Sequence, residues 1–316
     1  MNPSQKPLGS GFGARSTVSD VLQGIDLGGR YALVTGGASG LGLAAVRALV
    51  ASGAEVLVPA RNMAAAANTF AGEAGVTVAP FDLADQQSIT AFAETVLKAG
   101  RPLDMLIASA GIMACPETRI GPGWESQFGT NHLGHFALVN HLAPLLVAGR
   151  ARVVMVSSGA HGITGMRWDD VQFDKGYDKW AAYGQSKTAN ALFAVELDRR
   201  GAGVGVRAFS LHPGAILTPL QRHLPKEEMV AAGWIDAAGN AATYFKSVAQ
   251  GAATMVWAAT SPLLEGIGGV YCEDCDVAPL ATEGKGVRPH AVDPDEARRL
   301  WALSVELTGV DGFAAS

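Results

Sequence analysis

The sequence predicts an α/β fold, in which helices cover both faces of one doubly wound parallel sheet. Short apolar runs alternate with helical patterns from residue 30 to residue 272, which is how a chain builds a parallel sheet. The runs are almost wholly apolar, as expected for strands that are buried on both faces. No Pro/Ser-rich tract or charged block interrupts the alternation, so we expect a single domain over residues 30–316 after an N-terminal extension, residues 1–29.

The composition is that of a globular chain with a small-molecule partner. Of the 316 residues, 48% are hydrophobic and only 17% are charged, which is enough apolar surface for a large core. The formal net charge of −5 offers no basic surface to nucleic acid or to an anionic membrane. The polar N-terminus and the interrupted apolar runs lead us to expect a cytoplasmic protein without a membrane span.

A glycine turn follows the first strand, residues 31–34. Gly36, Gly40 and Gly42 remove side chains where the chain reverses and where the next helix would meet a ligand. The N–H groups of a helix N-terminus carry partial positive charge, so the expected occupant is a phosphate group. The spacing G-x-x-x-G-x-G departs by one residue from the dinucleotide fingerprint, and an ordinary glycine-rich turn remains the alternative.

The second strand, residues 55–59, ends at Ala60 and Arg61. In a dinucleotide-binding sheet the residue at this place faces the adenosine ribose, where an acid would repel a 2′-phosphate. No acid is present, Ala60 leaves room, and Arg61 offers a planar cation suited to phosphate. We therefore expect NADP rather than NAD, the alternative being that Arg61 is a solvated surface residue.

Asp82 and Leu83 follow the third strand, residues 76–80, which comes after an expected helix over residues 62–74. The Asp82 carboxylate could accept from the adenine amino group. Alternatively, Asp82 or Asp85 only caps the following helix, and both roles can coexist.

Two later strands end at further candidate residues. Residues 103–108 lead to Ala110 and Gly111, where the chain can approach a cofactor closely. Residues 152–156 deliver Ser158 at the carboxyl end of the sheet, which is where open α/β sheets bind ligands.

Two patterns could suggest a metal, and we predict none. His132 and His135, on the expected fourth helix, lack a third ligand in the sequence. Cys272 and Cys275 form a C-x-x-C without a second pair or a nearby histidine, so coincidence is the better explanation.

In the second half of the chain, residues 159–182 form a long connection rich in aromatic residues. We expect some of these aromatic side chains to border a substrate cavity. Residues 215–244, rich in Ala and Gly, are a predicted substrate lid. The other expected elements are helices over residues 183–201 and 245–259, strands over 204–211 and 269–272, and a helix that opens at 293–294.

Tyr183 and Lys187 lie four residues apart on one predicted helix, so their side chains share a face. A phenol can donate a proton to a carbonyl oxygen as the carbonyl carbon receives a hydride, and in reverse it must act as a phenolate. An ammonium at about 4 Å would favour the phenolate by about 4 kcal/mol at an effective dielectric of 20. That is roughly three pKa units before desolvation. A tyrosine with a lysine four residues later is common by chance, so the assignment depends on the motifs around the pair.

The order of these features resembles the short-chain dehydrogenase/reductase family over about residues 30–272. Residues 131–136 (NHLGHF), 157–161 (SSGAH) and 300–309, together with Arg61, resemble its retinol-dehydrogenase-like branch. The resemblance implies a Rossmann-type sheet of about seven strands in the order 3-2-1-4-5-6-7. It also implies a homodimer or homotetramer that pairs through the helices flanking the fifth strand.

The resemblance also assigns roles to residues. Ser158, Tyr183, Lys187 and Asn131 would form the catalytic tetrad, in which Asn131 could hold a water that relays protons. One departure is visible: the family's Asn-Asn-Ala-Gly reads Ala-Ser-Ala-Gly at residues 108–111, so a bond of the missing asparagine must be replaced or lost. The cofactor would contact Gly36, Ser39, Gly40, Leu41, Gly42, Arg61, Asp82, Leu83, Ala110, Gly111, Tyr183, Lys187, Pro213, Gly214, Ile216 and Thr218.

The expected function is that of an NADP(H)-dependent oxidoreductase acting on a hydrophobic ketone or aldehyde, or the corresponding alcohol. The competing hypothesis is a catalytically silent dinucleotide-binding sensor or structural subunit, which should have lost a catalytic residue; none is missing. A sugar-nucleotide epimerase ranks lower, because it would have a differently spaced glycine turn and a larger C-terminal region. The sequence leaves the individual substrate and the direction of reaction open.

Overall fold

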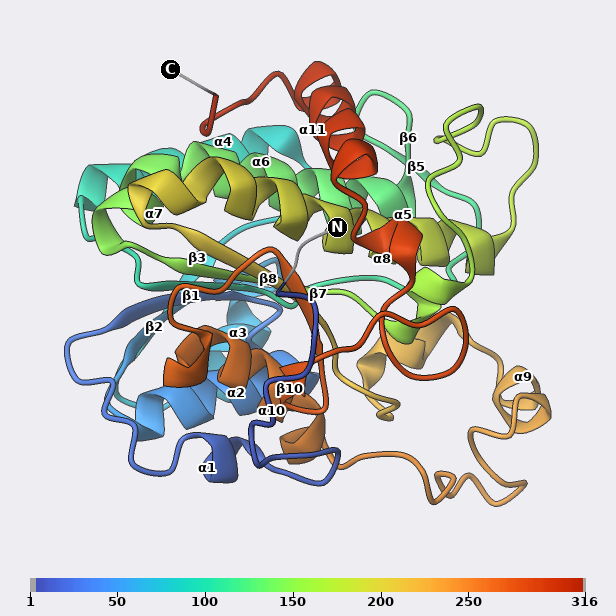
Figure 1. Ribbon diagram of the computed structural model, residues 1–316, viewed down its shortest axis with the longest axis horizontal. Coiled ribbons are helices and arrows are strands. Elements are labelled where there is room, and N and C mark those ends of the chain that lie inside the picture. The colour runs from blue at the N-terminus through green and yellow to red at the C-terminus, as the bar shows by residue number, and fades with distance from the viewer. Residues whose placement is uncertain (1–3, 315–316) are drawn as a thin grey trace.

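An eight-stranded sheet forms the centre of the computed structural model, which describes residues 4–314 (Figure 1). Its order is β10-β9-β8-β7-β4-β1-β2-β3, and all neighbours are parallel except β10 and β9. The seven parallel strands confirm the predicted order. Their bounds are β1 Tyr31–Thr35, β2 Glu55–Ala60, β3 Val76–Pro80, β4 Met105–Ala108, β7 Arg152–Val156, β8 Arg207–His212 and β9 Val270–Glu273, with β10 at Asp276–Val277.

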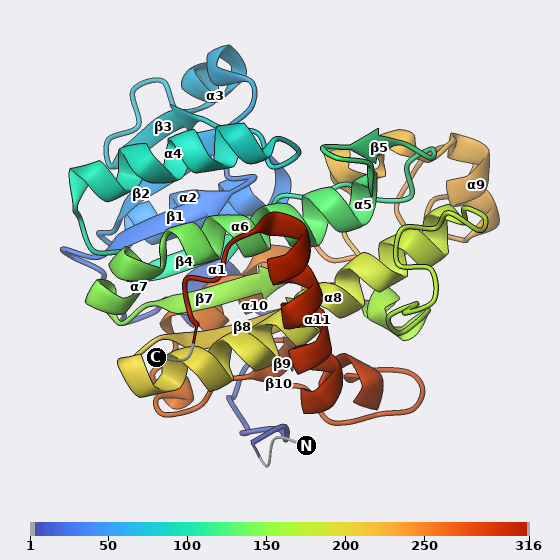
Figure 2. The same cartoon turned by 90° about the horizontal axis from the view of Figure 1, so that it is seen from above.

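Helices cover both faces of the sheet, as Figure 2 shows from above. Strand residues alternate between the two: Val34 packs in one core cluster and Leu33 in the other. The first cluster includes α1 (Val18–Val21), α2 (Gly40–Ala51) and α10 (Val248–Thr260). The second includes α4 (Gln86–Ala99), α6 (Gly134–His141), α7 (Ala143–Gly149) and α8 (Lys179–Gly201).

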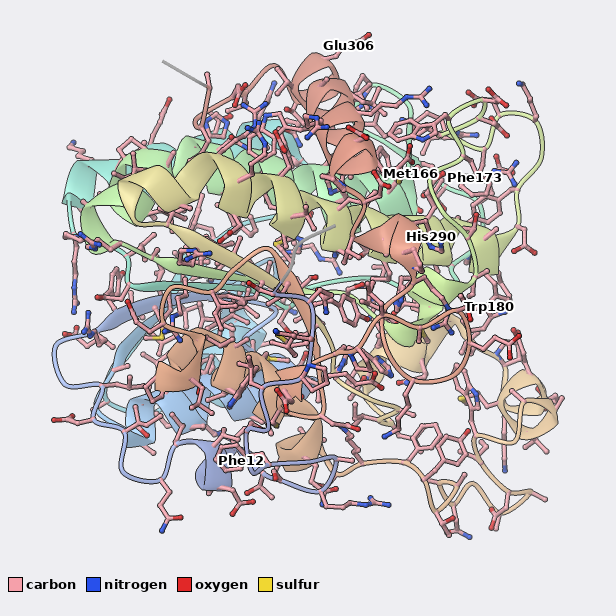
Figure 3. All side chains as sticks on the ribbon, in the orientation of Figure 1. Phe12, Met166, Phe173, Trp180, His290 and Glu306 are labelled. Atoms are coloured by element: carbon pink, nitrogen blue, oxygen red, sulfur yellow. The ribbon has the colours of Figure 1, made fainter. Side chains whose placement is uncertain are left out.

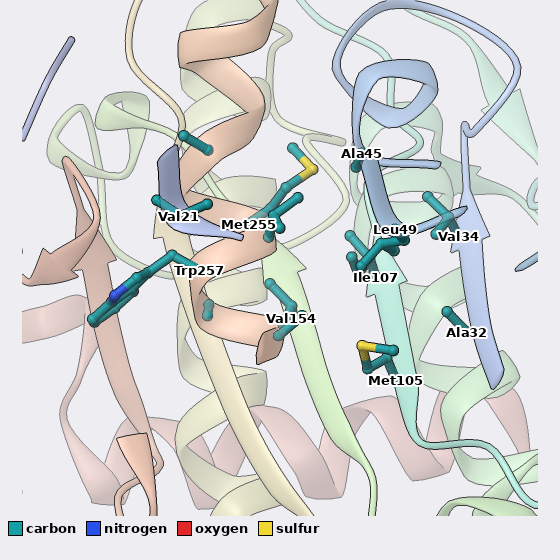
Figure 4. Close-up of a cluster of buried hydrophobic side chains, with 14 of the residues drawn as sticks. Val21, Ala32, Val34, Ala45, Leu49, Met105, Ile107, Val154, Met255 and Trp257 are labelled. Carbon is teal, nitrogen blue, oxygen red and sulfur yellow. The ribbon is translucent and has the colours of Figure 1, made fainter. Parts of the chain in front are cut away.

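Figure 4 shows the first cluster, where Val34 and Ile107 meet Leu49 of α2, while Met255 and Trp257 come from α10. All five side chains are fully buried. Because such strands have no solvent-facing side, their sequences are apolar throughout. Across residues 4–314, no helix combines the length and apolar character that crossing a bilayer requires.

The predicted fourth helix is not a single α-helix. A small hairpin of β5 (Arg119–Ile120) and β6 (Trp124–Glu125) leads into the short helix α5 (Ser126–Phe128). A π-helical turn, η1 (Gly129–Leu133), then joins α5 to α6. Such turns carry one extra residue per turn, often at functional sites. This one contains Asn131.

Two other helices have different bounds from the expected ones, and local features explain both. The helix expected over residues 62–74 is the shorter α3 (Met63–Thr69), and Gly72 beyond it has a positive φ. α8 begins at Lys179, because the Asp178 side chain accepts from the backbone N–H groups of its first turn. β10 was not predicted.

The N-terminal extension contacts the last strands and the lid. The Gln5 amide donates to the carbonyls of Tyr271 and Ala278 and accepts from the Tyr271 N–H at 2.8 Å. Backbone N–H groups of residues 8–10 donate to the Asp276 carboxylate, and Arg15 donates to the Phe245 carbonyl. The N-terminal extension therefore lies along the edge of the sheet that β9 and β10 form.

The C-terminal helix α11 (Pro294–Thr308) lies across α8 (Figures 1 and 2). Its Trp301 stacks on Phe193 of α8 with ring centroids 5.6 Å apart, and meets the Phe136 ring of α6 edge-on at 4.9 Å. The Arg200 guanidinium lies 4.5 Å from the Trp301 ring centroid. α11 therefore covers the part of the helices flanking β7 that lies around these residues, and the predicted dimer or tetramer stays a prediction.

Replacing Trp301 with alanine should lower the free energy of unfolding by about 3–5 kcal/mol, because the side chain is 2% exposed and its removal leaves a large cavity. Denaturant titration followed by circular dichroism measures the change. Glu306→Ala, at an exposed position of the same helix, is the control and should change it by less than about 0.5 kcal/mol. Equal midpoints for Trp301→Ala and the wild type would contradict the packing role.

Candidate active site

A cavity of about 920 Å³ opens at the carboxyl ends of the central parallel strands. It is the place where parallel α/β sheets bind their ligands. Asn131 lies behind the cavity wall and is fully buried. The predicted residues that line the cavity are Gly36, Ser39, Gly40, Leu41, Gly42, Arg61, Asp82, Leu83, Ala110, Gly111, Ser158, Tyr183, Lys187, Pro213, Gly214, Ile216 and Thr218.

The glycine turn, here called the glycine cradle, packs so closely against backbone atoms that Gly36 and Gly42 have no room for a side chain. Gly36 has a φ of +68°, and a Cβ there would lie 2.9 Å from the Ala110 backbone. A Cβ on Gly42 would lie 2.4 Å from the Gly36 carbonyl oxygen. Ser39 occupies the N-cap of α2 without a side-chain capping bond, so its hydroxyl does not take up the N–H groups there. The turn therefore fits the pyrophosphate of a dinucleotide.

Asp82 and Asp85 make different contacts, and only Asp85 caps α4. The Asp85 carboxylate accepts from the Gln87 N–H and caps α4. One Asp82 oxygen accepts from the Ala84 N–H, and the residue lines the cavity. Arg61 is exposed at the cavity edge, and among the described residues it has no hydrogen-bond or ion-pair partner. Its guanidinium is thus free to meet a ligand.

Tyr183 and Lys187 both line the cavity. The Lys187 Nζ lies 5.6 Å from the Tyr183 ring centroid and donates to the Val156 carbonyl at 3.0 Å. Burial raises the Tyr183 pKa to about 12. The nearby Ser158 side chain has the opposite but smaller effect on this pKa. Burial also lowers the Lys187 pKa to about 8. The effect of Lys187 on the Tyr183 phenol was expected before desolvation, and it stays a prediction, because burial is the largest cause of the shift.

Asn131 connects the π-helical turn to the loop after β4. Its Nδ2 donates to the Ile112 carbonyl and to Ser186 Oγ, both at 2.9 Å, while its Oδ1 accepts from the Ile112 N–H at 2.9 Å. A Cβ on Gly111 would lie 3.0 Å from Asn131 Oδ1 and 3.7 Å from Lys187 Nζ. The missing side chain at Gly111 is what lets Asn131 and Lys187 lie this close to the loop.

A buried hydrogen-bond network that the sequence did not reveal supports Asn131. Thr35 Oγ1 accepts from the N–H groups of Ser109 and Ala110, so its own proton points to His135 Nε2, 2.8 Å away. His135 Nδ1 then donates to the Asn131 carbonyl at 2.9 Å. The Thr35 hydroxyl thus holds the loop backbone at residues 109–110, where the family's asparagine is missing.

The predicted lid is partly helical. It contains the 3-10 turn η4 (Pro219–His223), capped by Thr218, and the helix α9 (Lys226–Ala231). Glu228 of α9 lies 2.6 Å from Lys179 Nζ and accepts from Trp180 Nε1 at 3.0 Å. The lid is therefore attached to the first turn of α8, four residues before Tyr183.

Among the aromatic residues expected to border the cavity, Trp180 lines it, at the N-terminal end of α8 (Figure 3). Phe173, in the loop before α8, is buried elsewhere. The Trp180 ring meets Trp234 edge-on with centroids 5.9 Å apart. The sequence did not single out several apolar lining residues, which are Met113, Leu220, Leu224, Met229, Trp234 and Phe245.

The two histidines and two cysteines considered as metal ligands lie in packed interiors. His132 Nε2 is 2.8 Å from Ser304 Oγ, while His135 belongs to the Thr35 network. Both Cys272 and Cys275 are buried free thiols. Within residues 4–314, no three His, Cys, Asp or Glu side chains gather in a group that could hold a metal ion.

Comparison with known proteins gives one consistent result. A family profile described as short chain dehydrogenase matches residues 30–229. A probable oxidoreductase of Streptomyces lividans is 49% identical over 297 residues, covering 89% of this chain and 98% of the relative. Mouse retinol dehydrogenase 14 is 36% identical over 306 residues, covering 89% and 86%.

The solved structures agree. An uncharacterised protein from Mycobacterium paratuberculosis is 33% identical and superposes with a TM-score of 0.72 over 94% of this chain and 98% of its own. Fold, sequence profile and full-length relatives all point the same way. The chain belongs to the short-chain dehydrogenase/reductase family and is an oxidoreductase that acts on CH–OH groups, with retinol-dehydrogenase-like relatives.

Proposed function

We propose that the protein is an NADP(H)-dependent reductase of hydrophobic ketones or aldehydes, with Tyr183 as the acid. One observation carries this proposal: the buried Tyr183 phenol and Lys187 amine line the same cavity as Ser158 and the glycine cradle. The bound nicotinamide would supply or accept the hydride. The glycine turn would hold its pyrophosphate, and Pro213, Gly214, Ile216 and Thr218 would border the nicotinamide end.

In this mechanism Tyr183 donates its proton to the carbonyl oxygen. A pKa of about 12 keeps the phenol protonated at neutral pH, which is the form needed for reduction. Ser158 would hydrogen-bond the same oxygen, and the Lys187 ammonium would stabilise the phenolate as it forms. Asn131 fixes the loop beside Lys187 and could hold a water that returns the proton.

The preference for NADP over NAD rests on Arg61. Its guanidinium lies at the end of β2 beside Ala60, without a protein partner among residues 4–314, and no acid follows the strand. A planar cation there suits the 2′-phosphate.

The substrate class follows from the cavity walls beside Tyr183. Met113, Leu224 and Tyr183 form a small apolar cluster against which Trp180 and Trp234 pack. Apolar and aromatic walls with few polar groups favour an uncharged, bulky carbonyl compound. Parallel assays of NADPH and NADH oxidation with bulky ketones, steroids and retinoid-like aldehydes test the proposal. Failure of every carbonyl with both cofactors would contradict it.

Tyr183→Phe should lower kcat about 10²- to 10⁴-fold, because it removes the proton that the product oxygen receives. NADPH affinity, measured by nucleotide fluorescence, should change little. Tyr31→Phe is the matched control, because Tyr31 lies at the start of β1, and the glycine cradle follows the other end of that strand. Wild-type turnover by the Tyr183 variant would refute its assignment as the acid.

Arg61→Ala should raise KM for NADPH about 10- to 100-fold, the effect of losing a hydrogen bond to a charged group, and leave KM for NADH unchanged. Arg101→Ala, whose guanidinium pairs with Glu55, should affect neither. If NADH is the better donor for the wild type, Arg61 does not set cofactor choice.

The rate of reduction should fall as pH rises through about 8. Lys187, with a pKa lowered to about 8 by burial, carries its charge below that pH and loses it above, so it no longer stabilises the phenolate. Steady-state kcat between pH 6 and 10 measures this. The residual activity of Lys187→Met should lack this decline, and a flat wild-type profile to pH 10 would exclude the role.

A further inference from the structure

Three donors converge on the backbone carbonyl of Ser158. The His161 N–H donates at 3.1 Å and closes the 3-10 turn that follows β7. The His161 imidazole also lies with Nδ1 2.6 Å from this oxygen, and the Tyr271 hydroxyl donates to it at 3.1 Å. The turn alone satisfies the carbonyl, so satisfying it does not require the two side chains.

The proton positions of His161 follow from its other partner. The Arg288 backbone N–H donates to His161 Nε2 at 3.1 Å, so Nε2 carries no proton and Nδ1 is the donor. Burial lowers the His161 pKa to about 4, which keeps the ring neutral at physiological pH. The imidazole is thus held in the one tautomer that can donate to Ser158.

Both side chains are themselves fixed. His161 is 2% exposed, and its carbonyl accepts from His290 Nε2 at 2.9 Å (His290 is labelled in Figure 3). Tyr271 is fully buried in β9. The Gln5 side chain donates to its carbonyl and accepts from its N–H. The next residue after Ser158, Gly159, donates to His212 Nδ1 at 2.9 Å. The serine therefore sits in a rigid frame that links β7, β8 and β9.

We propose that His161, together with Tyr271, is a positioning residue that orients Ser158 toward Tyr183. The proposal rests on the proposed function, in which the Ser158 hydroxyl bonds the phenol and the substrate oxygen. Fixing the carbonyl fixes the peptide plane after Ser158 and with it the backbone that carries the side chain. The Ala160 N–H, which donates to Ser158 Oγ at 3.1 Å, holds the hydroxyl on that backbone. Misplacement of a catalytic hydroxyl by about 1 Å can cost on the order of 10²-fold in rate.

The test compares two replacements of His161, using the best ketone from the substrate screen. His161→Leu removes the donor and should lower kcat about 10- to 100-fold, with NADPH affinity unchanged. His161→Asn keeps an N–H near the place of Nδ1 and should recover kcat to within about threefold of the wild type. His290→Leu removes a contact to the His161 carbonyl and not to Ser158, so it should lower kcat less than His161→Leu does.

A double-mutant cycle with Ser158→Ala separates positioning from a general structural role. If His161 acts through Ser158, adding His161→Leu to Ser158→Ala should lower kcat by less than about twofold further. Losses that multiply would overturn the proposal. If His161→Leu does not fold, Tyr271→Phe removes the other donor at nearly constant volume and takes its place in the cycle.

The outcomes distinguish the two proposals. If Ser158→Ala lowers turnover while His161→Leu and Tyr271→Phe do not, the positioning role fails and the proposed function stands. If Ser158→Ala keeps wild-type turnover, the assigned role of Ser158 fails, and the positioning role fails with it. A crystal structure of His161→Leu gives a readout without substrate: Ser158 Oγ should have moved away from the Tyr183 hydroxyl.

Discussion

The hydroxyl of Thr35 is the contact on which the geometry of the site depends. It accepts from two backbone N–H groups of the loop after β4 and bonds His135, which in turn donates to the Asn131 carbonyl. One side chain at the end of β1 thereby joins the glycine cradle, the neighbouring strand and the π-helical turn. Gly36 against Ala110, and Gly111 against Asn131, allow the backbones to approach as closely as this network requires.

The same tight packing sets the electrostatics. Tyr183 and Lys187 are buried, so the neutral form of each is favoured and their pKa values move apart, to about 12 for the phenol and about 8 for the amine. A Coulomb estimate from the sequence contains only the attraction between phenolate and ammonium. It leaves out the cost of desolvating a phenolate, which depends on burial and which the spacing of two residues does not reveal.

Features that depend on local sequence could be predicted. Apolar runs gave the seven parallel strands, and the residues that follow them gave most of the cavity lining, because strand ends in a parallel sheet share one edge. The features that the sequence did not predict depend on tertiary contacts or on unusual backbone conformations. The turn before β10 places Asp274 and Cys275 at φ of +52° and +61°, a conformation that usually signals itself through glycine or asparagine. Trp301 packs on residues far away in the sequence, and His161 is held by Tyr271 and Arg288, which are also distant from it in the sequence.

The frame around Ser158 extends beyond the segment that defines the family. The profile matches residues 30–229, whereas Gln5, Tyr271, Arg288 and His290 all lie outside it. Within the matched segment, His161 completes the frame only because Arg288 fixes its tautomer and Tyr271 shares its acceptor. The core of the fold thus places the serine at the edge of the sheet, and the two ends of the chain restrict its orientation. A hydroxyl that must serve both a phenol and a substrate oxygen benefits from this restriction, because each lost rotational freedom is entropy that the reaction need not remove.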